Sequence, residues 1–73
     1  MSQTVTAAYD RVDKATNAFH ELVADGYARE EIFLDNDTAQ IKVIAPDSLQ
    51  GAVEEILKRH EPDSVWARPF PEQ

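Results

Sequence analysis

Two stretches of the chain carry apolar residues at helical spacing. They span residues 10–25 and 46–60, and in each the apolar positions recur at intervals of three and four, on one face of a helix. Gly26 follows the first stretch, where a left-handed glycine commonly ends a helix, and Pro62 follows the second, where proline prevents continuation. We therefore predict two amphipathic helices with these apolar stripes: Ala15, Ala18, Phe19, Leu22 and Val23 in the first, and Leu49, Ala52, Val53, Ile56 and Leu57 in the second.

Short polar residues at the start of each predicted helix suggest how its N-terminus is capped. Asp10 or Asp13 is expected to accept hydrogen bonds from the first free amides of the first helix. Asp47 with Gln50 three residues later resembles a capping box for the second helix. His60 falls in the last turn of that helix, where a positive charge suits the helix dipole, so we interpret it as a helix-terminal cation.

Four shorter stretches are predicted to be β-strands, because apolar and polar residues alternate along most of each. They span residues 4–10, 31–35, 39–45 and 64–70. The second and third are joined by Asp35-Asn36-Asp37, which predicts a tight turn and hence an antiparallel hairpin. Pro69 cannot donate a ladder hydrogen bond, so the last strand is expected at an edge of the sheet.

The order of these elements is strand, helix, strand, strand, helix, strand. Right-handed crossovers place both helices on the same face of one sheet. The predicted fold is therefore α+β, a ferredoxin-like βαββαβ arrangement with a four-stranded antiparallel sheet and two helices on one face. We expect residues 1–73 to form one domain.

The second face of such a sheet is left uncovered, and it carries the most informative prediction. If Ile41 and Val43 point toward the helices, alternation places several large residues outward, where an apolar patch of this kind marks an interaction site. We predict an interface made of Phe33, Ile44, Trp66, Arg68 and Phe70. The alternative is a strand register shifted by one residue, which would invert every side chain and make Trp66 a core residue.

Chain length and cysteine content favour association with a partner. A chain of 73 residues buries only about 60% of the surface that it exposes when unfolded, so its stability is marginal. The sequence holds no cysteine, which removes disulfides and thiolate metal sites as sources of stability. We therefore expect the chain to bind itself, as a homodimer, or another protein.

The charge balance argues against two classes of partner. Fourteen acidic residues outnumber seven basic ones, giving a formal net charge of -7. This charge opposes binding to nucleic acids and to anionic membranes, which attract clustered lysine and arginine. The chain also has no apolar run near the ~20 residues of a membrane helix and no signal-peptide pattern, so we expect a cytoplasmic protein.

The sequence offers few candidates for chemistry. His20 and His60 are the only histidines, and neither stands at the spacing that metal ligands need. The segment from Asp35 begins like a calcium loop, yet Gln40 stands in place of the loop glycine and Pro46 in place of the final glutamate, so we interpret the segment as a turn. We expect no catalytic, cofactor-binding or metal-binding residues and no cofactor.

Several packing motifs resemble a known bacterial family. The residues are Val5-Thr6-Ala7-Ala8-Tyr9-Asp10, the spaced residues Ala15, Ala18, Glu21 and Leu22, the step Gly26-Tyr27, the strand Glu31–Leu34, and the later segment Ala52–His60 followed by Val65. They resemble the bacterial general stress or heat-induced stress protein module. The resemblance implies the ferredoxin-like fold and a stress-associated or accessory role, without a catalytic motif. ACT-type ligand sensors are a second possible relative, although the turn at residues 10–13 lacks their glycine.

Three functions are therefore open at this point. The first is a non-enzymatic module that self-associates through its open sheet face. The second is a regulatory sensor of ACT or PII-like type, in which Arg11, Arg29 or Arg68 holds a small anionic ligand. The third is a small cofactor-free isomerase-like enzyme with His20 or His60 as its base.

Overall fold

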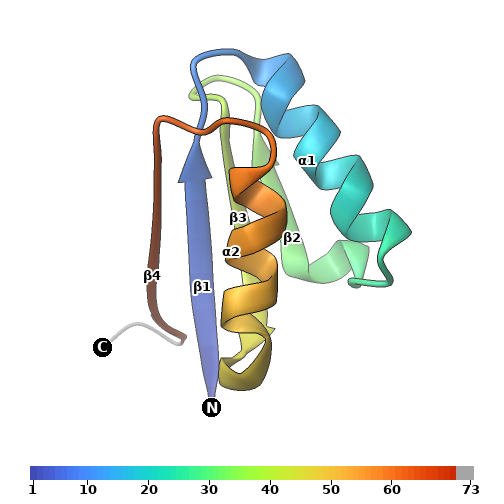
Figure 1. The fold of residues 1–73 in the computed structure, drawn as a ribbon, viewed down its shortest axis with the longest axis vertical. Helices are drawn as coiled ribbons and strands as arrows, with labels where there is room; N and C mark the ends of the chain where they lie inside the picture. The colour runs from blue at the N-terminus through green and yellow to red at the C-terminus, as the bar shows by residue number, and fades with distance from the viewer. Residues whose placement is uncertain (71–73) are drawn as a thin grey trace.

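The computed structural model describes residues 1–70, and its elements follow the predicted order (Figure 1). The strands and helices are β1 Ser2–Ala8, α1 Val12–Ala24, β2 Ile32–Asp35, β3 Gln40–Pro46, α2 Gln50–Lys58 and β4 Ser64–Phe70. Short 3₁₀ turns at Arg29–Glu31 and Asp47–Leu49 precede β2 and α2. The protein has the predicted ferredoxin-like α+β fold, with a four-stranded antiparallel sheet and two helices.

The sheet has the strand order β2-β3-β1-β4, and both helices lie in front of it in Figure 1. The core forms between these two layers, because the alternate residues of β1 and β3 that face the helices are apolar. Its fully buried large side chains are Val5, Ile41, Val43, Leu22, Val53 and Leu57.

The strand register settles which residues share a face of the sheet. Thr6 lies opposite Lys42 on one side and Trp66 on the other, and Phe33 lies opposite Lys42. Val65 and Ala67, the neighbours of Trp66, pack against the core. Trp66 therefore points away from the helices, and the alternative of a shifted register is wrong.

Gly26 ends α1 as predicted. Its φ of 101° is left-handed, and its amide donates to the carbonyl of Val23 at 3.0 Å. The next amide, that of Tyr27, donates to the carbonyl of Leu22 at 3.1 Å. This pair of hydrogen bonds is a Schellman motif, which satisfies the last carbonyls of the helix and turns the chain toward β2.

The predicted helix caps are wrong, because each carboxylate has a closer partner. α1 begins at Val12 and α2 at Gln50, and within residues 1–70 neither has a side-chain cap. The Asp10 carboxylate lies 3.1 Å from Nζ of Lys14, and the Asp47 carboxylate accepts a hydrogen bond from Nε2 of Gln3 at 3.0 Å. The remaining two side chains also pair nearby: Asp13 with Arg11, and Gln50 with Glu54.

Backbone hydrogen bonds beside β1 fix the orientation of the sheet edges. The Tyr9 amide donates to the Ala39 carbonyl and the Asp47 amide to the Met1 carbonyl, each at 2.9 Å. Bonded and non-bonded pairs alternate in antiparallel strands, so odd-numbered residues of β1 bond to β3 and even-numbered ones to β4. Odd-numbered residues of β4, including Pro69, therefore turn their backbone toward the free edge. The prediction that Pro69 marks an edge strand is confirmed.

Candidate functional site

The open face of the sheet brings the predicted interface residues to one side of the molecule. One cross-strand row runs Phe33, Lys42, Thr6, Trp66 over all four strands. The next row runs Ile44, Thr4, Arg68, and a third places Phe70 opposite Ser2. All five residues of the predicted interface therefore lie on the face opposite the helices.

Three aromatic rings of this face are open to solvent. Phe33 is 53% exposed, Phe70 42% and Trp66 36%, and Ile44 is partly buried. Thr6 lies on the same face and yet is only 3% exposed. Its cross-strand neighbours Lys42 and Trp66 flank it on both sides, so we attribute its burial to their side chains.

The open face differs in charge from the rest of the chain. Among the strand residues that point outward, the charged ones are Asp35, Lys42 and Arg68, which give the face a net charge of +1. The whole chain carries -7, so the acidic residues gather elsewhere, on the helix layer and the loops. Like charges therefore do not prevent two copies of this face from meeting.

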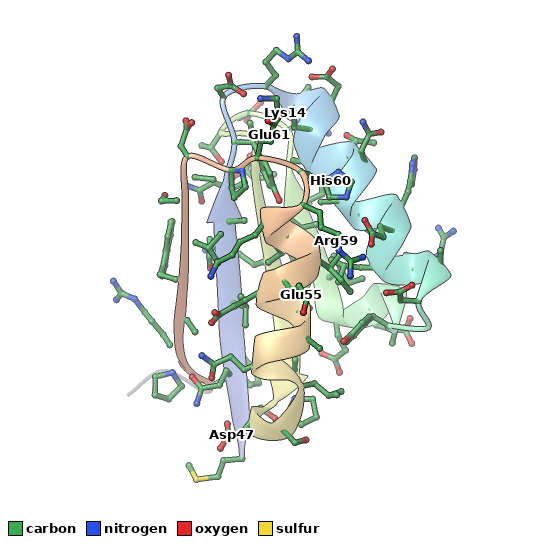
Figure 2. All side chains as sticks on the ribbon, in the orientation of Figure 1. Lys14, Asp47, Glu55, Arg59, His60 and Glu61 are labelled. Atoms are coloured by element: carbon green, nitrogen blue, oxygen red, sulfur yellow. The ribbon has the colours of Figure 1, made fainter. Side chains whose placement is uncertain are left out.

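A second cluster of polar side chains joins the two helices on the opposite layer (Figure 2). Oε1 of Glu21, on α1, lies 2.7 Å from Nε2 of His60, which follows α2. The guanidinium of Arg59 bonds the other oxygen of Glu21 and lies 3.6 Å from the Glu55 carboxylate. His60 and then Arg59 lower the pKa of Glu21 below its ordinary value, and Glu21 in turn raises the pKa of Arg59. This helix clamp, defined as Glu21, Glu55, Arg59 and His60, was missed in the sequence because its halves are 34 or more residues apart along the chain.

The two histidines lie in different environments. His60 has a side chain that is 22% exposed and belongs to the helix clamp, so its partner is Glu21 and it lies past the end of α2 at Lys58. His20 is exposed on α1, with its ring 5.8 Å from that of Phe19. A carboxylate that orients a histidine is a recurring feature of general bases, but a base also needs a cavity for its substrate.

A groove of about 400 Å³ does lie on the helix layer, next to the clamp. One wall is the turn after α1, from Asp25 to Tyr27, and the other is the α2 side, with Leu49, Ala52, Ile56 and the clamp residues Glu55 and Arg59. Neither His20 nor His60 is among the residues that line it. The groove therefore offers the isomerase-like hypothesis no histidine base among its lining residues.

The three arginines proposed to hold an anionic ligand lie in three different places. Arg11 precedes α1 and lies 3.3 Å from the Asp13 carboxylate. Arg29 follows α1, with its guanidinium carbon 5.9 Å from the centre of the Phe19 ring. Arg68 lies on the open sheet face. A single copy of the chain therefore does not bring them together around one ligand.

The segment that begins like a calcium loop forms a turn. Oδ1 of Asp35 accepts hydrogen bonds from the amides of Asp37 at 2.9 Å and Thr38 at 3.3 Å. These bonds lower the pKa of the Asp35 carboxyl, because they favour its charged form. Across residues 1–70, histidines and carboxylates form no group of three or more that could hold a metal ion.

In the described part of the chain, no helix is both long enough and apolar enough to cross a membrane. The longer of the two helices, α1, has 13 residues.

Comparisons with known proteins give no relative from which a role could be taken. Searches against protein-family models, curated proteins and solved structures each found no match to this chain. The resemblance to the bacterial stress protein module therefore stays a prediction, and the argument for function rests on the geometry of the two faces.

Proposed function

We propose that this chain is a non-enzymatic interaction module that forms a homodimer through its open sheet face. The observation that carries the proposal is the presence of three exposed aromatic residues, on the two edge strands, on a face that no helix within residues 1–70 covers. Phe33, Trp66 and Phe70 are each more than a third exposed there. Burying such rings against a second copy removes apolar surface from water, at about 25 cal/mol per Å².

The edges of the sheet are poor alternatives for self-association. β2 has only four residues, which gives a second strand little to pair with. On the free edge of β4 the outward backbone amides belong to Val65 and Ala67, and Pro69 next to them has no amide hydrogen. Pairing of strands between copies would therefore be short at either edge, which favours the face.

Charge supports a second copy on this face rather than on the helix layer. Two chains of net charge -7 repel each other, and the repulsion is smallest when the acidic helix layers point away from one another. Pairing through the sheet faces achieves this orientation, because each of these faces carries a net charge of only +1.

The size of the face suits a weak dimer. Three strands of seven residues and one of four, about 4.8 Å apart and rising about 3.4 Å per residue, cover roughly 400 Å² in projection. The total accessible surface of the described chain is 4471 Å², so the face is about a tenth of it. Two such faces give roughly 800 Å² in total, less than the roughly 1,200–2,000 Å² of a standard interface, so we expect a weak dimer that needs the whole face and not one corner.

Two substitutions of similar chemistry on opposite layers test the proposal. We expect Phe33→Ser, on the open face, to raise the dimer dissociation constant at least tenfold in sedimentation velocity runs over a concentration series. Leu49→Ser is the control, because Leu49 is 40% exposed on the helix layer. Equal dissociation constants for the two variants, or a wild type that stays monomeric, would contradict the proposed interface.

Two finer hypotheses accompany this proposal. A stress-related role rests on the family resemblance alone, and unchanged transcript levels during heat shock of the source cells would count against it.

A small anionic ligand bound at the dimer boundary would have to use Arg68, the one of the three arginines on that face. Isothermal titration of wild type and Arg68→Gln with amino acids and nucleotides tests that alternative, and equal heats for both would exclude Arg68.

A further inference from the structure

The groove on the helix layer has an apolar floor that the proposed dimer leaves free. Leu49 and Ala52 are exposed at its α2 side, and Ile56 lies one turn further along the helix. Tyr27 forms the opposite wall and is held in place by the hydrogen bond of its amide to Leu22. The volume of about 400 Å³ is in the range of pockets that enclose a small ligand or a few side chains.

The rim of the groove is negatively charged. Asp25 and Glu55 contribute carboxylates, and Arg59 is the only cation among the residues that line it. Its guanidinium already bonds Glu21 and lies 3.6 Å from Glu55, so its charge is compensated within the protein. An incoming group therefore meets apolar side chains in the middle and a rim where Asp25, Glu55 and Arg59 sum to a net charge of -1.

We propose that this groove docks a basic amphipathic segment of another protein, with an apolar side chain on the groove floor and lysine or arginine beside the rim. Apolar anchors in a groove are the usual way in which helical segments are recognised. Charge complementarity selects a basic partner, and it excludes a second copy of this chain, which would bring a further net charge of -7 to an acidic rim. The groove and the open sheet face lie on opposite layers, so both can be occupied at once.

The test uses two synthetic helix-forming peptides and the full chain labelled with ¹⁵N. The first peptide is built from leucine, alanine and lysine, and the second has glutamate in place of every lysine. We expect the lysine peptide to give saturable shifts of the amide resonances of Gly26, Tyr27 and Ala52, and the glutamate peptide to give none. Largest shifts on the strand residues Phe33 and Trp66, or no saturable shift with the lysine peptide, would overturn the proposal.

A pair of identical substitutions separates docking from general attraction to an acidic protein. Ala52→Arg places a long cation in the groove, and Ala24→Arg places the same cation at an exposed position at the end of α1, outside the lining residues. Both sites are exposed, so both variants should fold, and the dispersion of their amide spectra verifies this. We expect Ala52→Arg to weaken binding of the lysine peptide at least tenfold and Ala24→Arg to change it less than threefold. Equal weakening in the two variants would show non-specific attraction and would contradict the groove.

Failure of this inference is distinguishable from failure of the dimer. Leu49→Ser should weaken the lysine peptide and leave the dimer dissociation constant unchanged. Phe33→Ser should raise the dimer dissociation constant and leave the binding of the lysine peptide unchanged. If Leu49→Ser binds the lysine peptide as the wild type does, the apolar floor of the groove is not the docking site.

Discussion

Oε1 of Glu21 lies 2.7 Å from Nε2 of His60, which joins α1 to the chain just after α2. The same carboxylate bonds the guanidinium of Arg59, so one acidic side chain holds two basic ones. The contact adds charged partners where the two helices pack directly against each other. It is therefore the place where a change in protonation should alter the stability of the helix layer.

Acid should lower the stability of the fold, because it protonates the carboxylate of Glu21. His60 and Arg59 lower its folded pKa below the ordinary value of 4.5, so its contribution to stability is present above that pH and is lost as pH falls through the folded value. We expect Glu21→Gln to lower the denaturant midpoint at neutral pH. As the pH falls below 4.5, the midpoints of Glu21→Gln and the wild type should approach each other. Urea unfolding at a series of pH values measures this.

Glu30→Gln is the matched control for the acid limb. Glu30 is an exposed glutamate in the 3₁₀ turn Arg29–Glu31 before β2, outside the helix clamp. Its substitution should leave the pH dependence near that of the wild type. A constant difference between Glu21→Gln and the wild type across the acid range would contradict the assigned role of Glu21.

The phenol of Tyr9 should stabilise the fold at neutral pH and should make its stability depend on pH in alkaline solution. Its hydroxyl donates to the carbonyl of Leu57 at 2.7 Å in the core, and the ring is 4% exposed. We expect Tyr9→Phe to reduce the free energy of unfolding by about 1 kcal/mol, the usual value of one hydrogen bond, and Tyr9→Ala to reduce it by about 3–5 kcal/mol.

The alkaline part of this prediction follows from burial. Desolvation raises the pKa of Tyr9 from 10.0 to about 12, so stability should fall as pH rises through this interval, because the unfolded phenol releases its proton first. Tyr9→Phe has no phenol and should lack this part of the decline. The difference in free energy of unfolding between the wild type and Tyr9→Phe should therefore become smaller as the pH rises above 10. A deficit that widens above pH 10 would show that the phenol is not the group responsible.

Two residues with left-handed backbone should respond in opposite directions to substitution. Gly26 has a φ of 101° and open space where a Cβ would stand, so Gly26→Ala should cost about 1–2 kcal/mol through backbone strain alone. Glu61, exposed after α2, has a φ of 59°, so Glu61→Gly should gain up to about 1 kcal/mol. Guanidinium unfolding curves compare the two, and a loss of stability in Glu61→Gly would indicate a contact of its side chain that outweighs the strain.

Trp66 should stabilise the single chain as well as the proposed dimer. Thr6, its cross-strand neighbour, is 3% exposed on the open face, so removing the indole uncovers it. Since about two thirds of Trp66 is already covered in one copy, Trp66→Ala should cost roughly 2 kcal/mol even at dilutions where the dimer is absent. Thermal unfolding at low concentration measures this, and an unchanged melting temperature would mean that the burial of Thr6 has another cause.

The sequence predicted most of the sheet because its signals are local, although β1 begins and ends two residues earlier than predicted. β4 has the predicted bounds of Ser64 and Phe70, although the face on which Trp66 lies was decided only by the register of the folded strands. Gly26 and Pro69 were also predictable, because each has a backbone constraint that few environments satisfy. The outward positions of Phe33 and Ile44 followed from the alternation of side chains along their strands.

The helix starts and the clamp were not predictable for the opposite reason. Asp10 and Asp47 have the composition of caps, but Lys14 and Gln3 lie near enough to take their carboxylates, and only the folded chain shows this competition. Glu21 meets His60 because of how the helices pack, and nothing in the spacing between them indicates it. The groove beside Tyr27 likewise depends on the angle at which the chain leaves α1.

Light scattering of the wild-type protein, from low to high concentration, measures directly whether the chain associates with itself. The chain has a mass of 8.2 kDa, and we expect a rise toward about 16 kDa with concentration. In Trp66→Ala the rise should shift to at least tenfold higher concentration. A mass of 8.2 kDa at every concentration, or a dimer that Trp66→Ala leaves intact, would contradict association through the open sheet face.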